Sequence, residues 1–84
     1  MFIQLGGDCC VLSKHIVGVF DLDKITVKKA AREYINRAEK EGSLIYADIY
    51  ELPKSLIVTK DISYLSPLNT ATVLKRIKNR KAKE

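Results

Sequence analysis

Few side chains in this sequence could carry out catalysis or bind a metal ion. The two cysteines, Cys9 and Cys10, are adjacent, and His15 is the one histidine. Because free cysteine is among the most buried residue types, we expect both to be small packing residues. A strained vicinal disulfide or a metal site with His15 is the alternative. Structural zinc sites, however, use four ligands in separated pairs, so we predict no metal site.

Other polar motifs also have simple structural interpretations. Asp21 and Asp23 stand at the end of an apolar stretch, where carboxylates usually cap helices or form turns. The pair Gly6-Gly7 lacks the lysine of a phosphate loop and favours a turn with positive φ. Ser66-Pro67 is typical of a helix start, with serine as the cap. We therefore predict neither an enzyme nor a bound cofactor.

Positive charge is concentrated at the end of the chain. Residues 1–74 contain nine basic and nine acidic residues, so the whole net charge of +5 lies in the last ten residues. Such a cluster can bind phosphates, solubilise the chain or complement the negative end of a helix dipole. The basic residues of this cluster are Lys75, Arg76, Lys78, Arg80, Lys81 and Lys83. Three tyrosines could stack on bases or simply pack at strand positions: Tyr46, Tyr50 and Tyr64.

The elements that must position these residues begin with strands. Residues 2–5 and 9–12 predict two strands joined by the glycine turn. Residues 16–22 are almost continuously apolar, which favours a strand covered on both faces by helices or by a partner subunit. A helix should follow from a cap at Asp23 or Thr26 to about Glu41, with Gly42 ending it in a left-handed conformation.

The second half predicts more strands and a final helix. Residues 44–50 alternate as in a strand, residues 51–55 indicate a hairpin tip, and residues 56–59 and 62–65 complete the strands. A C-terminal helix is expected from Ser66 to about Lys78. The fold class is therefore α+β, a small and largely antiparallel sheet with one central helix and a C-terminal helix. We expect one domain over residues 1–78 and a basic, frayed tail over residues 79–84.

Three segments then indicate a family: FIQLGGD at residues 2–8, IVGVFD at 16–21 and YLSPL at 64–68. They resemble the extracellular matrix regulatory protein A/B family of bacterial biofilm regulators. The resemblance implies a cytoplasmic homo-oligomer, ring-shaped in A-type relatives, that binds double-stranded DNA and is linked to biofilm matrix gene expression. The absence of an apolar run as long as a membrane span, and of a signal peptide at the start, agrees with a cytoplasmic protein.

The sequence also departs from the A-type pattern. Those relatives carry arginines where this chain has His15, Glu51 and Leu52, which leaves Lys14 and Lys54 as the nearest substitutes. Together with the C-terminal cluster, these two lysines are the candidate DNA-binding residues. The leading hypothesis is a non-enzymatic, homo-oligomeric, DNA-binding transcription regulator. The alternative is a protein-interaction or assembly partner that does not bind DNA.

Overall fold

The structure is a computed structural model that describes residues 2–83, with side chains described as far as Lys78. Its elements, in chain order, are β1 (Phe2–Gly6), β2 (Cys9–Leu12), η1 (Ser13–His15), β3 (Ile16–Asp21), α1 (Leu22–Ile25), α2 (Lys29–Lys40), β4 (Leu44–Tyr46), β5 (Ser55–Thr59), β6 (Ser63–Ser66) and α3 (Thr70–Lys83). Strand pairs β1–β2, β3–β5 and β5–β6 are antiparallel, and β4–β6 is parallel. The predicted α+β class with a largely antiparallel sheet is confirmed.

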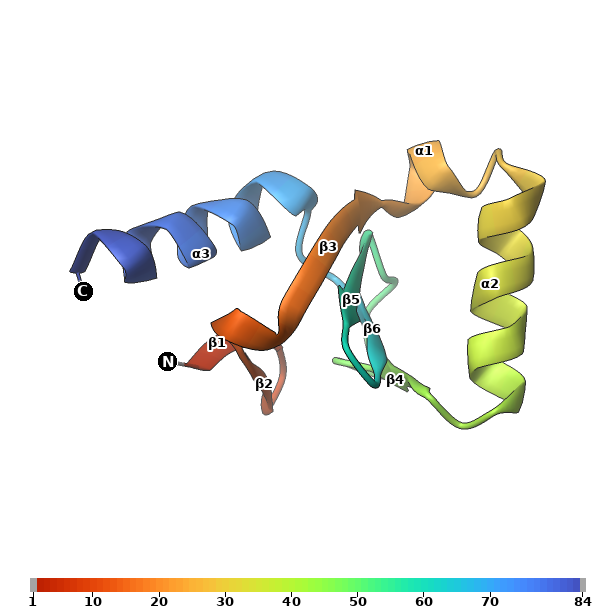
Figure 1. Cartoon of the computed structure of the whole chain (residues 1–84), viewed down its shortest axis with the longest axis horizontal. Helices are drawn as coiled ribbons and strands as arrows, with labels where there is room; N and C mark the ends of the chain where they lie inside the picture. Colours follow the sequence, from red (N-terminus) through yellow and green to blue (C-terminus); the bar gives the residue numbers. More distant parts are fainter. Residues whose placement is uncertain (1, 84) are drawn as a thin grey trace.

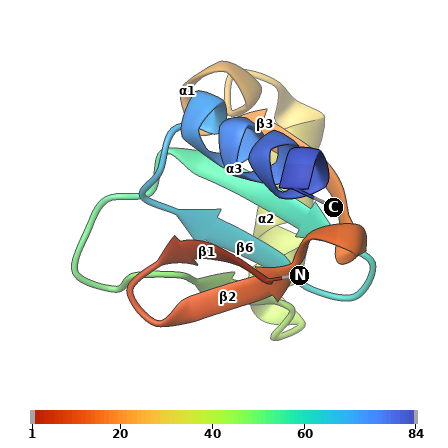
Figure 2. The same ribbon diagram turned by 90° about the vertical axis from the view of Figure 1, so that its left-hand side faces the viewer.

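The elements form three layers. A four-stranded sheet in the order β3-β5-β6-β4 lies in the middle, and β1 and β2 form a separate two-stranded hairpin. The hairpin and α3 cover one face of the sheet, and α2 lies over the other face (Figures 1 and 2). Within residues 2–83, no helix is both long enough and apolar enough to cross a membrane.

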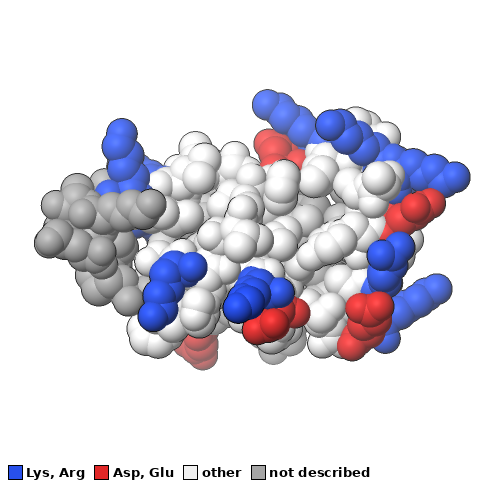
Figure 3. Space-filling view, viewed as in Figure 1, with Lys and Arg blue, Asp and Glu red and all other residues white. Residues whose placement is uncertain are grey.

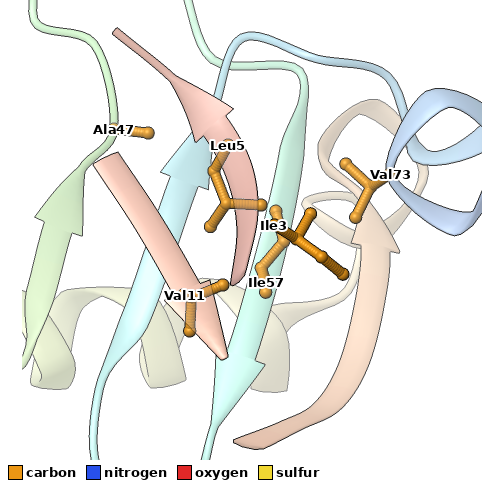
Figure 4. Packing of buried hydrophobic residues seen from close by; sticks show 6 residues of the cluster. All are labelled: Ile3, Leu5, Val11, Ala47, Ile57 and Val73. Carbon is orange, nitrogen blue, oxygen red and sulfur yellow. The ribbon is translucent and has the colours of Figure 1, made fainter. Parts of the chain in front are cut away.

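The main hydrophobic core lies between the hairpin, α3 and the sheet. Alternation along β1 points every second side chain inward, which buries Ile3 and Leu5 while Phe2 and Gln4 stay exposed. The buried cluster consists of Ile3, Leu5, Val11, Ala47, Ile57 and Val73 (Figure 4). Residues from both ends of the chain therefore share one core with the central strand β5.

The glycine turn between β1 and β2 is confirmed and lies in a crowded place. Gly6 and Gly7 have φ of 144° and 49°, in the region that favours glycine. A Cβ on Gly6 would lie 2.9 Å from the Pro67 ring, and a Cβ on Gly7 would lie 3.2 Å from the Ala47 carbonyl oxygen. The turn is thus held against the end of β6 and the segment after β4.

The prediction that Ser66 caps the last helix is wrong. Ser66 is the final residue of β6, and its buried hydroxyl donates to the Leu5 carbonyl and accepts from the Leu68 amide. The side chain that serves the helix start is Asn69, whose Oδ1 accepts from the Thr72 amide at 2.8 Å. The helix begins at Thr70 and its backbone continues to Lys83, beyond the predicted end.

The predicted central helix is two helices in the structure. Asp21, rather than Asp23 or Thr26, caps α1 by accepting from the amides of Asp23 and Lys24. The chain then breaks before α2 starts at Lys29. Gly42, with φ of 75°, ends α2 as predicted. The amides of Gly42 and Ser43 bond to the Glu39 and Ala38 carbonyls, as in a Schellman motif.

The predicted strand over residues 44–50 is shorter, and it does not form a hairpin with the next strand. β4 ends at Tyr46 and pairs with β6, so β4 and β5 are not neighbours in the sheet. Asp48 explains part of this early end, because its carboxylate accepts from the Tyr50 amide and forms a turn. Residues 47–54 are therefore a loop that connects two non-adjacent strands.

Candidate functional site

The two isolated lysines proposed from the sequence do not lie together. Lys14 is in η1, just before β3, and Lys54 immediately precedes β5. Because Ile16 pairs with Thr59 and Asp21 with Ser55, these lysines stand at opposite ends of the β3–β5 ladder. Both are exposed, but they do not form a single basic patch.

The basic residues of α3 differ from one another in their surroundings. The Arg76 guanidinium donates to the Gln4 carbonyl at 2.8 Å, which ties the helix to β1. Lys75 and Lys78 are exposed. The structure describes side chains only as far as Lys78, so it does not describe those of Arg80, Lys81 and Lys83. On the face in Figure 3, basic and acidic side chains are interspersed over the α2 end, and most of the middle carries no charge.

A more distinctive feature is the loop of residues 47–54. The Ala47 amide donates to the Leu65 carbonyl at 2.8 Å, and the Lys54 amide donates to the Ser66 carbonyl at 2.7 Å. Two successive carbonyls of β6 therefore hold the two ends of the loop together. This arrangement is that of an Ω-type loop, a class that is frequently functional.

The tip of this loop is apolar and exposed. Ile49 is 76% exposed, Tyr50 90% and Leu52 85%. We call these three residues the loop patch. Grouped apolar side chains in water usually mark a surface that another molecule covers. The sequence predicts a strand and a hairpin tip for this segment, so the prediction missed the patch. The signal that could have revealed the patch was its apolar composition, which is unusual for a hairpin tip.

A second set of exposed apolar side chains lies on β3, at the opposite edge of the sheet. Val17 is 70% exposed and Phe20 is 41% exposed, whereas Ile16 and Val19 pack against the core. A register shift between Ile16 and Gly18 places Val17 in a bulge of this edge strand. Within the described chain, the expected cover over both faces of this strand is therefore incomplete.

The residues that suggested chemistry are scattered. Cys9 packs against the core, but Cys10 is exposed, so the expectation that both cysteines pack is wrong for Cys10. Burial, and then the neighbouring Cys10, raise the pKa of the Cys9 thiol, which leaves it protonated at neutral pH. Among the described residues, no three His, Cys, Asp or Glu side chains group as metal ligands would.

Together these features define a small α+β protein with exposed apolar side chains at β3 and in the loop after β4. A family model described as Extracellular matrix regulatory protein A-like matches residues 2–77. The curated Extracellular matrix regulatory protein B of Bacillus subtilis (strain 168) is 34% identical over 76 residues, which cover 90% of this chain and 89% of that relative. The chain therefore belongs to the extracellular matrix regulatory protein A-like family, as the resemblance indicated.

Two of the segments that carry the resemblance meet in the structure. The glycine turn from the N-terminal segment contacts Pro67, which belongs to the Ser-Pro segment. The Ser66 hydroxyl adds a hydrogen bond to the Leu5 carbonyl, one residue before the turn. The residues that carry the resemblance thus hold the hairpin on the sheet, which is a structural role.

Proposed function

We propose that this chain is a non-enzymatic, homo-oligomeric regulator of biofilm matrix gene expression that acts in the cytoplasm. The observation that carries the proposal is the presence of two exposed apolar surfaces: the loop patch beside β4, and Val17 and Phe20 on β3. β3 and β4 are the two end strands of the sheet. Burying apolar area is the main favourable term in most protein association.

The two surfaces differ from each other, which bears on how copies would assemble. A contact between unlike surfaces joins copies head to tail, and it closes into a ring when the rotation per subunit permits. In the proposed assembly, the loop patch of one copy packs against the β3 edge of the next. Every copy then uses both surfaces, and the contact covers the apolar side chains of the loop patch and of β3 that are exposed in the single chain.

The mass in solution tests the assembly. Light scattering should give a multiple of the 9.5 kDa chain mass at micromolar concentration. Leu52→Ser should lower the mass toward that of one chain, because Leu52 is 85% exposed in the loop patch. Val27→Ser is the matched control, because Val27 is 75% exposed but lies between α1 and α2. A parent mass near 9.5 kDa would exclude the oligomer.

DNA binding is the second part of the proposal, and the exposed Lys75 and Lys78 on α3 favour it. A modest positive surface on each subunit becomes strong when a closed assembly repeats it along a duplex. Lys14 and Lys54 would contribute separately, given their positions at opposite ends of β3 and β5. Glu51 opposes binding if the loop faces phosphate, since it places a negative charge at the loop tip.

Fluorescence anisotropy with duplex DNA at low and physiological salt tests this part. Deleting residues 78–84 removes four basic residues and one acid, and it keeps Ile77, which packs against the core. The deletion should weaken binding and flatten its salt dependence, because fewer counterions are released. Glu51→Arg should strengthen binding. A folded parent oligomer that binds no duplex at low salt would favour the alternative, an assembly partner that does not bind DNA.

A further inference from the structure

A cavity lies between α2 and the sheet, on the face opposite the main core. Its volume is about 270 Å³, and all of its lining side chains present apolar surface: Phe20, Ile25, Ala31, Tyr34, Leu56 and Val58. These residues come from β3, α1, α2 and β5. The cavity is therefore formed where four elements meet, underneath the helix that spans this side of the molecule in Figure 1.

α2 is held to the sheet from its middle toward its C-terminal end. There Ala38 is buried, and the Tyr34 hydroxyl is hydrogen-bonded to the Ser63 hydroxyl at 2.7 Å. Nearer its start, α2 contributes only the small side chain of Ala31 to the cavity wall. On the sheet side, the Phe20 ring lies against Gly18, where a Cβ would come within 2.7 Å of the ring. Neither wall supplies a side chain that fills the space.

Two lysines border the cavity at its α1 end. An adjoining depression shares Phe20 and Ile25 with the cavity, and its other lining residues are Val19, Asp21, Lys24 and Lys28. Among the described residues, neither lysine has a carboxylate within 4.0 Å of its ammonium group. The Asp21 carboxylate is engaged by the amides of Asp23 and Lys24. The apolar cavity thus adjoins a depression that contains two lysine ammonium groups and one carboxylate, and that carboxylate is already hydrogen-bonded to backbone amides.

We propose that this cavity binds the hydrocarbon tail of a medium-chain carboxylate, with the carboxylate beside Lys24 and Lys28. An apolar cavity offers a polar ligand no hydrogen-bond partner but accepts a hydrocarbon readily. Its volume is near the lower end of small-molecule sites, roughly 300 Å³, which favours a medium chain over a long one. The two lysines discriminate for an anionic head. This inference rests on neither the oligomer nor DNA binding, and it shares one residue, Phe20, with the proposed contact surface of β3.

Decanoate is the probe, and decanol is its uncharged counterpart. Titration of the ¹⁵N-labelled full chain with decanoate should give saturable shifts at the amides of the lining residues, including Ala31 and Leu56. The amides of Leu5 and Val11, which belong to the core on the other face of the sheet, serve as an internal reference and should not shift in a saturable way. Decanol should bind the same residues about fivefold more weakly, as expected for a partly exposed ion pair.

Two variants separate the tail from the head. Ala31→Leu fills the cavity and should weaken both probes by at least about tenfold, with the fold checked by circular dichroism. Lys24→Gln combined with Lys28→Gln should weaken decanoate to the level of decanol and leave decanol unchanged. Lys40→Gln combined with Lys75→Gln is the control, because it removes the same charge at two exposed positions, one at the last residue of α2 and one on α3, over the other face of the sheet.

Three results would overturn the proposal. Saturable shifts confined to the loop patch would assign the binding to a general apolar surface. Equal affinity of the parent for decanoate and decanol would remove the role of the lysines. An absence of saturable shifts in the parent would exclude the site directly, without reliance on any variant.

Discussion

The two faces of the central sheet are packed very differently. On the hairpin side, Leu5 and Val73 are fully buried and belong to the same buried cluster as Ile57 of β5. On the α2 side, a cavity separates helix and sheet, and Tyr34 is 41% exposed. The first face thus has a buried core, whereas the second retains unfilled space between helix and sheet. We infer that packing on the hairpin side supplies most of the free energy of unfolding. The side chains between α2 and the sheet have space in which to change their positions.

The largest predicted difference in unfolding free energy comes from truncating one apolar side chain on each face of the sheet. Leu5→Ala should lower the free energy of unfolding by about 2–5 kcal/mol, because it leaves a cavity in the closed core. Ile25→Ala should cost about 1 kcal/mol, since Ile25 is half-buried and already borders empty space. Urea denaturation measures both. Equal losses would contradict the proposed division of stability.

The glycine turn gives a second comparison, between a crowded and an open position. Gly6→Ala should cost about 2–3 kcal/mol, because it combines a positive φ with an overlap against the Pro67 ring. Gly42→Ala has a positive φ but no atom within 4 Å of the new Cβ, so it should cost about 1 kcal/mol. Thermal melting curves give the loss of unfolding free energy for each variant. The difference between the two losses measures the overlap of the new Cβ at position 6 with the Pro67 ring. It should shrink in a Pro67→Ala background.

The hairpin and α2 also differ in the hydrogen bonds that attach them to the sheet. Ser66→Ala leaves the buried Leu5 carbonyl without its partner and should cost about 1–3 kcal/mol. Tyr34→Phe removes the bond to Ser63 at a partly exposed site and should cost about 0.5–1 kcal/mol. Thermal unfolding of both variants tests the order. A larger loss for Tyr34→Phe would mean that α2 is held more firmly than its packing indicates.

The smallest expected effect concerns the cysteines, which face opposite sides of β2. Cys10 is exposed, and the raised pKa of Cys9 keeps its thiol protonated to higher pH. Reaction with a thiol reagent at pH 8 should therefore show a fast phase from Cys10 and a slow phase from Cys9. Cys10→Ser should abolish the fast phase. Its slow phase should keep accelerating as the pH rises further, because the Cys9 thiolate forms late.

Local signals explain which parts of the fold could be predicted. The hairpin turn and the end of α2 depend on glycines with positive φ, a property that acts within a few residues. Ser66 satisfied every local rule for a cap, yet its hydroxyl bonds to Leu5, 61 positions earlier. The parallel pairing of β4 with β6 was likewise unpredictable, since alternation along a strand does not specify its neighbour.

The candidate sites show the same limit. Net charge identified the basic end of the chain, but not the bond between Arg76 and the Gln4 carbonyl. Lys14 and Lys54 appeared equivalent as substitutes, and only the β3–β5 register placed them at opposite ends. The loop patch and the cavity depend on which side chains remain uncovered after packing, so only the three-dimensional structure could reveal them. Periodicity in the sequence reports the faces of an element, not the gaps between elements.

The contacts of the N-terminal hairpin have a consequence for the order of events during synthesis. Gln4 and Leu5 are synthesised before their hydrogen-bond partners, Arg76 and Ser66. The inward face of β1 therefore lacks part of its native cover until β6 and α3 have been made. A nascent chain halted before Val73 would expose Ile3 and Leu5, and it would be a substrate for chaperones or proteases. The core closes only after α3 has been synthesised, because Val73 supplies one of its buried side chains.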